Sequence, residues 1–511
     1  MPRMSGRQRK RSPPRVSGPD RSIFFFALSI RTRIGEWGFV ATDAELAARD
    51  ARIAQLEAQV AALTKQVAEL LEIVGRNSRN SHLPPSTDPP GARGGEGKGK
   101  GKPGQRKRGG QPGHGGSHRA LLPPGRVDEV VDLYPSYCEG CAGELPKVPD
   151  PSPRRFQQTE MPPVRPHTKE WRCHEVGCPS CGHRTRAPYD ATQIPASAFG
   201  PRLMALIALL TGVYHLSRRK TTDLLWELCG VRLSLGALSM IEARVSDALE
   251  PAVAEAWTRV GDGAVKHTDG TSWVQAGAVR ALWTIATKAA TVFKILADNS
   301  KKTLEPLYGS LRGILVSDRA KALNFWAMER RQICWAHLLR KFVSFSERAG
   351  PAGDIGRELL EYTGVVFEYW HDYRDGKLAR ATFAAWMAAL GPKLEVVLER
   401  AVAANIDGLS GSCADMLEHR QALWTFVDNA DVEPTNNHAE REIRAFVLWR
   451  KRSYGTQSDR GNVFAERVMT VAHTARKQNK NVLAFLTACC RACSGSGSRP
   501  SLFVPDAAVA A

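Results

Sequence analysis

The sequence predicts a multidomain α/β protein, and three observations support this prediction. The chain has 511 residues, enough for three or four domains of roughly 100–200 residues each. Apolar residues make up 43% of the chain, which suffices for a sizeable core. The residue pattern also changes along the chain, from heptads to paired cysteines, then to helices, and from about residue 264 to strands.

The positive charge is concentrated near the N-terminus. The net charge is +19, and residues 1–120 hold 22 Lys or Arg against 10 Asp or Glu. This asymmetry favours a polyanionic partner, nucleic acid before membrane. A cationic tail that only aids solubility is the plainer alternative. No apolar run approaches the roughly 20 residues that span a bilayer.

Residues 1–42 are basic and patternless, and we interpret them as a disordered arm. Residues 43–75 predict one helix with a heptad repeat. Its a and d positions hold Leu46, Ile53, Leu56, Val60, Leu63, Val67, Leu70 and Val74. β-Branched a positions with Leu at d are typical of a parallel two-stranded coiled coil, and so of a homodimer or higher oligomer. A single amphipathic helix packed on its own domain is the alternative.

Residues 76–125 are predicted to be a flexible cationic linker. The stretch 91–119 contains eight Lys or Arg, one Glu and many Gly, too few apolar groups to offset the entropy of ordering. Arg106, Lys107 and Arg108 are candidates for DNA phosphate contacts, with a solvated linker as the alternative.

Residues 126–195 are predicted to bind zinc. Two CxxC pairs, Cys138 with Cys141 and Cys178 with Cys181, supply the four thiolates of one tetrahedral structural Zn²⁺ site. The 36 residues between the pairs exceed the usual spacing, so we expect one or two β-hairpins there. Paired cysteines without a disulfide framework fit a reducing compartment, and we predict a cytoplasmic protein.

Residues 196–260 are predicted to be helical. Helices at 221–229 and 234–245 flank Gly230 and resemble a helix-turn-helix. The second helix carries few basic residues, so a structural hairpin is as good an interpretation as a DNA reader.

From residue 264 the order of elements is three strands, a helix and a fourth strand, as expected of a ribonuclease-H-like core. The strands are predicted at 265–274, 282–287, 292–296 and 313–318. Asp269 lies within the first strand and Asp318 at the end of the fourth, so both carboxylates are expected at one end of the sheet. Two such carboxylates can hold a pair of Mg²⁺ ions for phosphoryl transfer.

Several ordered motifs resemble the IS66-type transposases of bacterial insertion sequences. The resemblance rests on Cys334-Trp335-Ala336-His337 with the following Leu-Leu-Arg-Lys-Phe, on Asn436-Asn437-His438-Ala439-Glu440-Arg441, and on Arg450-Lys451 with Gly455 and Ser458. It extends to the heptad helix, the Asn-Ser-Arg-Asn-Ser and Gly-Gln-Pro-Gly-His segments and the paired CxxC motifs.

The resemblance implies a DDE-type transposase acting on double-stranded DNA, nucleoid-associated in a bacterial cytoplasm. Asp269, Asp318 and Glu440 are the implied catalytic acids and Mg²⁺ ligands, with Glu442 and Glu466 as rivals for the third. His337 is a candidate to contact the phosphate or a metal, or else a packed histidine. The remaining candidate DNA contacts are Arg340, Lys341, Arg444, Arg450 and Lys451, each with a solvated helix face as the alternative.

The predicted catalytic core comprises residues 261–325 and 430–495, with a helical insertion at 326–429 and a tail at 496–511. Two other functions share parts of this pattern. A ribonuclease-H-like nuclease would use the same acids without strand transfer. A zinc-containing DNA-binding regulator would not need Asp269 and Asp318.

Overall fold

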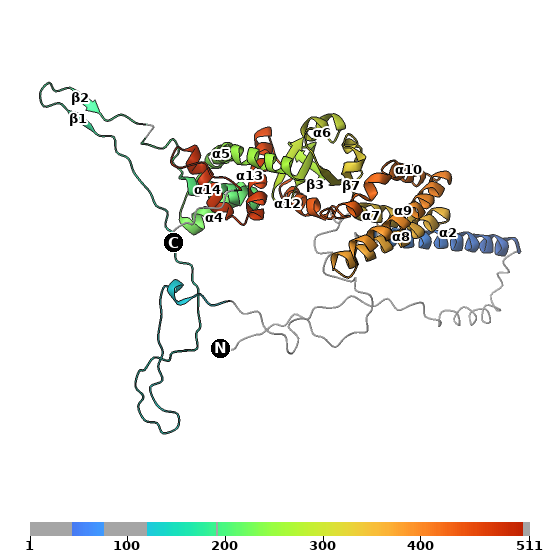
Figure 1. Cartoon of the computed structure of the whole chain (residues 1–511), viewed down its shortest axis with the longest axis horizontal. Helices are drawn as coiled ribbons and strands as arrows, with labels where there is room; N and C mark the ends of the chain where they lie inside the picture. Colours follow the sequence, from blue (N-terminus) through green and yellow to red (C-terminus); the bar gives the residue numbers. More distant parts are fainter. Residues whose placement is uncertain (1–42, 76–119, 191–192, 504–511) are drawn as a thin grey trace. The chain divides into compact units, whose positions relative to one another are not determined.

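The computed structural model describes residues 43–75, 120–190 and 193–503 of a mixed α/β chain (Figure 1). The chain divides into two units, Met1–Arg76 and Asn77–Ala511. The predicted arm, most of the predicted linker with Arg106, Lys107 and Arg108, and the end of the tail lie outside the described residues.

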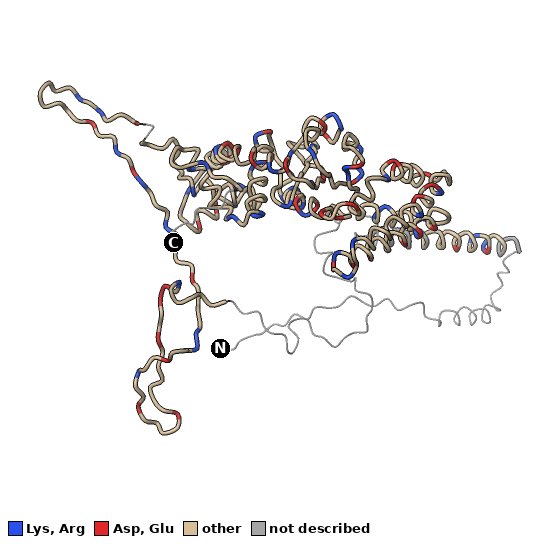
Figure 2. Tube along the Cα trace, viewed as in Figure 1, with Lys and Arg blue, Asp and Glu red and all other residues tan. Residues whose placement is uncertain are grey.

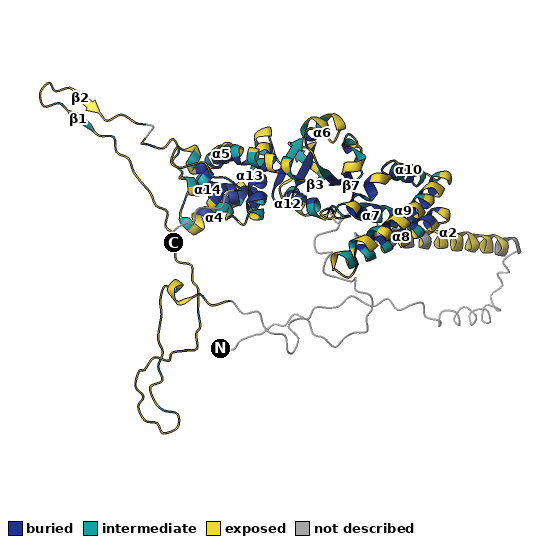
Figure 3. Ribbon diagram, in the orientation of Figure 1, coloured by how far each residue is buried: buried dark blue, intermediate teal, exposed yellow. Residues whose placement is uncertain are grey.

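The described part of the first unit is the helix α2 (Asp43–Gly75), at the bounds that the sequence predicts. Its apolar side chains are exposed along the described stretch, from Ile53 at 45% to Val60 at 61% (Figure 3). Acidic and basic residues occur along the same helix (Figure 2). An apolar stripe that stays exposed gains nothing from the hydrophobic effect within this unit.

The described part of the second unit begins with an extended stretch, residues 120–190. It contains a 3₁₀ turn at Pro124–Arg126 and an antiparallel hairpin of β1 (Glu175–Gly177) and β2 (Arg184–Arg186). This hairpin encloses the second CxxC pair. Residues 145–174, between the two pairs, form no strand. The prediction of a hairpin between the pairs is therefore wrong. Seven prolines in residues 145–174 explain this, because proline lacks the N–H that a ladder needs.

The next helices are α3 (Pro201–Ala208), continued by a π-helical turn at Leu209–Val213, then α4 (Arg218–Cys229) and α5 (Leu235–Asp262). Ser217 and Ser234 cap α4 and α5, and Gly230 adopts a left-handed conformation between them, as the predicted hairpin requires. The sequence predicts that the second helix ends near Val245. It runs on to Asp262 because its inward face, including Leu249 and Ala256, continues into the core.

A five-stranded mixed sheet lies at the centre of the second unit. Its strands are β3 (Val265–Gln275), β4 (Ala278–Ala286), β5 (Thr291–Leu296), β6 (Ile314–Ser317) and β7 (Arg331–Ile333), in the order β5-β4-β3-β6-β7. β3, β4 and β5 are antiparallel, whereas β6 and β7 run parallel to β3, with α6 (Lys301–Tyr308) between β5 and β6. Four strands lie where the sequence predicts them. The fifth, β7, falls within the segment predicted as helical insertion.

The insertion therefore begins after β7. Its helices are α7 (Trp335–Ser346), α8 (Pro351–Arg374), α9 (Arg380–Ala403), α10 (Ser410–Glu418) and α11 (Thr425–Asp428). They share a core that includes Phe342, Leu359 and Leu398 and reaches Val316 and Ile333 of the sheet. α9 is long and apolar enough to cross a membrane, but its buried face belongs to this core.

Three helices follow the insertion: α12 (Asn437–Ser453) and α13 (Asp459–Lys477), which pack on the sheet, and α14 (Val482–Cys493), which packs on α3 and α5. α13 contacts both α5 and β5, and α12 contacts β3 and β4 (Figure 1). One hydrophobic core joins Leu249 of α5, Trp273 and Phe293 of the sheet, Phe446 of α12 and Val468 of α13. The helical segment 196–260 thus shares a core with the sheet.

Candidate active site

Two aspartates lie side by side, one on β3 and one directly after the adjacent parallel strand β6. The register of β3 and β6 pairs Val265 with Ile314 and His267 with Val316. Two residues further on, the same register sets Asp269 beside Asp318, which directly follows β6. Neighbouring strands are about 4.8 Å apart, so the structure brings these two predicted residues together.

Three carboxylates influence one another at this edge. Burial, followed by the charges of Asp318 and Glu440, raises the pKa of Asp269 to about 8. Asp269 Oδ1 accepts a hydrogen bond from the amide of Gly270 (2.9 Å), which opposes the shift only in part. A group of carboxylates without enough positive charge is a site that a hard divalent cation would neutralise.

Glu440 reaches the site from the first turn of α12. Its Oε1 lies 3.6 Å from His337 Nδ1 and 3.7 Å from a guanidinium nitrogen of Arg340, both on α7. Glu440 Oε1 and His337 Nδ1 are buried and have no hydrogen-bond partner in the structure. His337 thus faces the acid rather than lying packed between Trp335 and Phe342.

Asn436 anchors α12 to β3, a role that the sequence did not reveal. Its position before α12 predicts a helix cap, but its side chain makes no capping bond. Instead, Nδ2 donates to the carbonyl of Thr268 (2.7 Å), Oδ1 lies 3.3 Å from His267 Nδ1, and the backbone N–H donates to Cys334 Sγ (3.1 Å). The Asn-Asn pair at the start of a helix marks Asn436 as a candidate cap, but the sequence does not predict that its side chain bonds β3.

The start of α7 belongs to the same edge, because α7 directly follows the parallel strand β7. The Cys334 amide donates to the carbonyl of Ser317 (2.8 Å), and the Trp335 amide donates to the carbonyl of Pro434 (2.8 Å). These bonds hold the start of α7 between β6 and the segment that leads into α12. Cys334, His337 and Glu440 consequently offer three ligand atoms within 4.8 Å of one another.

The two rival acids are engaged elsewhere. Glu442 Oε2 lies 2.5 Å from His473 Nδ1, and its Oε1 lies 3.1 Å from Lys477 Nζ. Burial alone would raise the pKa of Glu442, but His473 and Lys477 outweigh it and lower the pKa to about 2. Glu466 accepts a hydrogen bond from the amide of Ile295 (2.6 Å) on β5.

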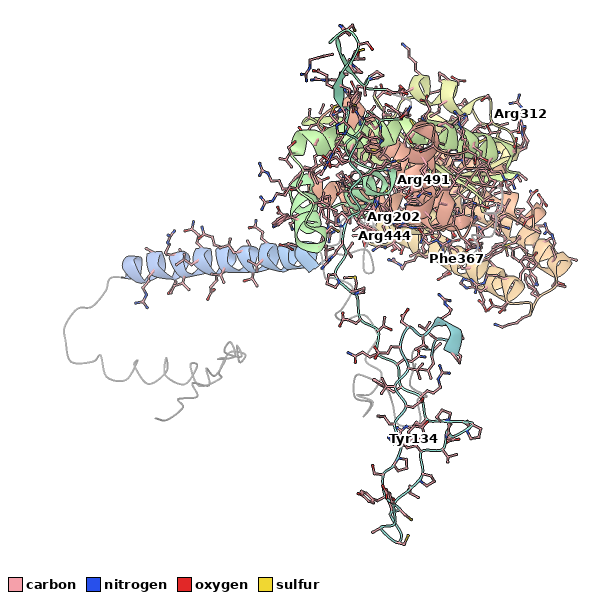
Figure 4. All side chains as sticks on the ribbon, turned by 90° about the vertical axis from the view of Figure 1, so that its left-hand side faces the viewer. Tyr134, Arg202, Arg312, Phe367, Arg444 and Arg491 are labelled. Atoms are coloured by element: carbon pink, nitrogen blue, oxygen red, sulfur yellow. The ribbon has the colours of Figure 1, made fainter. Side chains whose placement is uncertain are left out.

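The predicted DNA contacts within the described residues have four different surroundings. Arg340 lies beside Glu440, whereas Arg450 is tied to Ser272 and Thr271 of β3 and so stabilises the fold. Arg444, labelled in Figure 4, is exposed on α12, as is Lys451. Lys341 lies with its ammonium 5.2 Å from the ring centroid of Phe345 on α7.

The two CxxC pairs form matching turns. The amide of Cys138 donates to Gly143 and that of Ala142 to Cys138, and the same pattern recurs from Cys178 to His183. Backbone N–H groups lower the pKa of the first thiol in each turn, Gly140 acting on Cys138 and Ser180 on Cys178. Within the described residues the four thiols do not form one cluster. Each turn is nevertheless suited to present two thiolates to a metal.

Comparison with known families matches this chain to two of them. Residues 196–463, just over half of the chain, match the Transposase IS66 family. Residues 40–120 match a family of unknown function, DUF6444. None of the curated proteins matches the chain. The first match covers the sheet, the helical insertion and all of α12 with Glu440, so the chain belongs to the IS66 family of transposases.

Proposed function

We propose that this transposase is of the DDE type, and that Asp269, Asp318 and Glu440 are its catalytic acids. The observation that carries the proposal is that Asp269 on β3 lies beside Asp318, which directly follows β6, with Glu440 close enough to raise the pKa of Asp269. The strand order β5-β4-β3-β6-β7, with the first three strands antiparallel and the last two parallel to β3, supports a ribonuclease-H-like core.

The three acids suit Mg²⁺, a hard cation that prefers carboxylate oxygens. The raised pKa of Asp269 and the buried Oε1 of Glu440, which has no hydrogen bond, indicate that Arg340, 3.7 Å from that Oε1, does not balance the three acids alone. A pair of Mg²⁺ ions would activate the attacking oxygen and stabilise the leaving one. The protein's own contribution is to fix the acids: β3 and β6 hold the aspartates, and Asn436 joins α12 to β3.

The reaction proposed is cleavage at the ends of the insertion sequence followed by strand transfer. Water attacks a phosphodiester, a P–O bond breaks, and the departing oxygen takes a proton to become a 3′-hydroxyl. That hydroxyl then attacks a phosphodiester of the target, so one P–O bond forms as another breaks. Arg340 is placed to contact a phosphate oxygen next to Glu440.

The other parts of the chain would serve double-stranded DNA and assembly. The exposed apolar stripe of α2 supports a coiled coil that pairs two subunits, as two DNA ends require. The matching CxxC turns support one structural Zn²⁺ held by Cys138, Cys141, Cys178 and Cys181. Arg106, Lys107, Arg108, Lys341, Arg444 and Lys451 would contact phosphates, in the bacterial cytoplasm.

The experiment is to incubate purified protein with Mg²⁺ and a DNA fragment that carries both ends of its own insertion sequence. We expect nicks at defined end positions and joined products. Asp269→Asn, Asp318→Asn and Glu440→Gln should each lower cleavage by several orders of magnitude and leave DNA binding intact. Glu466→Gln is the matched control and should cleave.

Cleavage without joining would favour a nuclease. Specific binding without cleavage, unaffected by the aspartate substitutions, would favour a DNA-binding regulator. Full cleavage by Glu440→Gln would remove Glu440 as the third acid.

A further inference from the structure

The start of α7 and the start of α12 bring a thiol, an imidazole and a carboxylate together. Cys334 directly follows β7, His337 lies one turn into α7, and Glu440 lies in the first turn of α12. Their ligand atoms all lie within 4.8 Å of one another. We propose that Cys334, His337 and Glu440 form a site for one transition-metal ion of the Zn²⁺ class, which shares Glu440 with the proposed Mg²⁺ site and adds Cys334 and His337.

The geometry is close to that of a bound ion. Metal–ligand bonds of about 2.0–2.3 Å set tetrahedral ligand pairs about 3.3–3.6 Å apart. His337 Nδ1 and Glu440 Oε1 are already 3.6 Å apart, and closing the remaining separations takes movements of at most about 1 Å. Both atoms are buried and lack a hydrogen-bond partner, so an ion would satisfy them together.

The surroundings of Cys334 suit a coordinated thiolate. The amide of Asn436 donates to Cys334 Sγ (3.1 Å), and backbone N–H groups of Ala336 and His337 also favour the charged form. Burial nevertheless raises the pKa of this thiol to about 11. A metal ion would displace the proton, since a coordinating thiol is deprotonated outright.

The ligand set selects against Mg²⁺. One sulfur, one imidazole nitrogen and one carboxylate suit Zn²⁺ or Co²⁺, whereas Mg²⁺ requires oxygen ligands. Three protein ligands leave a fourth position open to solvent. The side chains of His337 and Glu440 are 30% and 27% exposed, so an ion can reach the site.

A second acidic group in the insertion provides a contrast. Asp415, Glu418 and His419 also lie close together. Nδ1 of His419 lies 2.6 Å from the carbonyl of Asp415, and Nε2 lies 3.2 Å from Asn324 Oδ1, while Asp415 also pairs with Arg319. Both ring nitrogens are therefore engaged, which leaves no imidazole ligand for an ion.

The test titrates the full chain with Co²⁺, which reports thiolate ligands by a charge-transfer band and tetrahedral geometry by its visible bands. The four-cysteine turns contribute equally to all variants, so the difference between parent and variant spectra isolates the new site. We expect Cys334→Ser and His337→Gln each to bind about one Co²⁺ fewer per chain than the parent.

Cys413→Ser is the matched control, because Cys413 is also a buried thiol whose pKa burial raises to about 11. It should bind as much Co²⁺ as the parent. His337→Gln keeps the test decisive if Cys334→Ser does not fold, since His337 is partly exposed. Equal Co²⁺ stoichiometry and superimposable spectra for the parent and His337→Gln would overturn the proposal. None of these measurements depends on DNA cleavage. A failure of this metal-site proposal can therefore be distinguished from a failure of the proposed function.

Discussion

Asp269 differs from most acids in the chain, because its surroundings penalise its charge. Burial comes first, and the charges of Asp318 and Glu440 add to it, which raises the pKa from 3.8 to about 8. In the unfolded chain this carboxyl ionises near pH 4, whereas in the folded, metal-free protein it keeps its proton up to about pH 8. The folded state therefore binds more protons than the unfolded state between these values, and stability falls as the pH rises through them.

We predict that Asp269→Asn stabilises the metal-free protein at high pH. With a chelator present, the free energy of unfolding at pH 8 should rise by about 2–4 kcal/mol, and the gain should shrink towards pH 4. Denaturant unfolding at both pH values measures this. Asp298→Asn is the control of opposite sign, because hydrogen bonds from Ser300 and Thr303 lower the pKa of Asp298 to about 2. Equal stability of Asp269→Asn and the parent at pH 8 would contradict the prediction.

The sequence predicts the roles of some residues at this site and not of others. Asp269, Asp318 and Glu440 could be named because strand patterns and motifs locate them. The roles of Asn436 and Arg331 could not. Asn436 resembles a helix cap but bonds β3, and Arg331 resembles a surface cation but is fully buried, bonding the carbonyl of Asp318 (2.9 Å) and the side chain of Asn324. Such contacts depend on which distant segment packs nearby, and local pattern does not encode that.

Among the elements, the turn between α12 and α13 is fixed by one glycine. Gly455 has φ +87°, and a Cβ there would lie 1.9 Å from the carbonyl oxygen of Val274 at the end of β3. The Thr456 amide donates to that same carbonyl (2.9 Å), and the Ala276 amide donates to Thr456 (2.8 Å). The turn thus fastens the end of β3 to the start of α13.

We predict that Gly455→Ala destabilises the protein by about 2–4 kcal/mol, from backbone strain and the clash together. Gly277→Ala is the matched control: its φ is +83°, but a Cβ there meets nothing within 4 Å. The control should lose only about 1–2 kcal/mol, the strain alone. Urea unfolding midpoints measure the loss of stability in both variants. If Gly455→Ala loses no more stability than Gly277→Ala, the backbone near Val274 relaxes enough to remove the clash, and the prediction is wrong.

For α2 we predict self-association through its heptad stripe. Leu56→Asp combined with Leu63→Asp places charges at d positions and should convert the oligomer to a monomer in sedimentation. Ala51→Asp combined with Ala58→Asp adds the same charge on the opposite face and should leave the oligomer intact. If the Leu variant sediments like the parent, another surface pairs the subunits.

The elements that the sequence predicted well are those with a strong period, such as α2, β3 and β5. The sequence does not predict strand β7, because two of its three residues, Arg331 and Gln332, are polar side chains that the fold buries. The length of α5 was underestimated for a related reason. Pro251 lies inside this helix and usually marks an end, but the packing of α5 on α13 carries it through.

At the scale of the molecule, two hydrophobic cores meet at the sheet. The first joins α3–α5, the sheet and α12–α14, and the second joins α7–α11 to Val316 and Ile333. Asp318 and Glu440 are 122 residues apart in sequence, and every buried residue of the second core except Val316 lies between them. The two acids are far apart in the sequence, and the packing of the insertion against the sheet brings them close together in the fold.

This order has a consequence during protein synthesis. A chain still attached to the ribosome completes β3, β6 and the insertion before α12 emerges, so it carries two acids and lacks the helices that cover Phe293. A gene copy interrupted by a stop codon before residue 440 would therefore encode a chain without the third acid. That chain would retain α2 and the cationic N-terminal segment, and, if these pair subunits and bind DNA as proposed, the decayed copy would encode a competitor of the intact transposase.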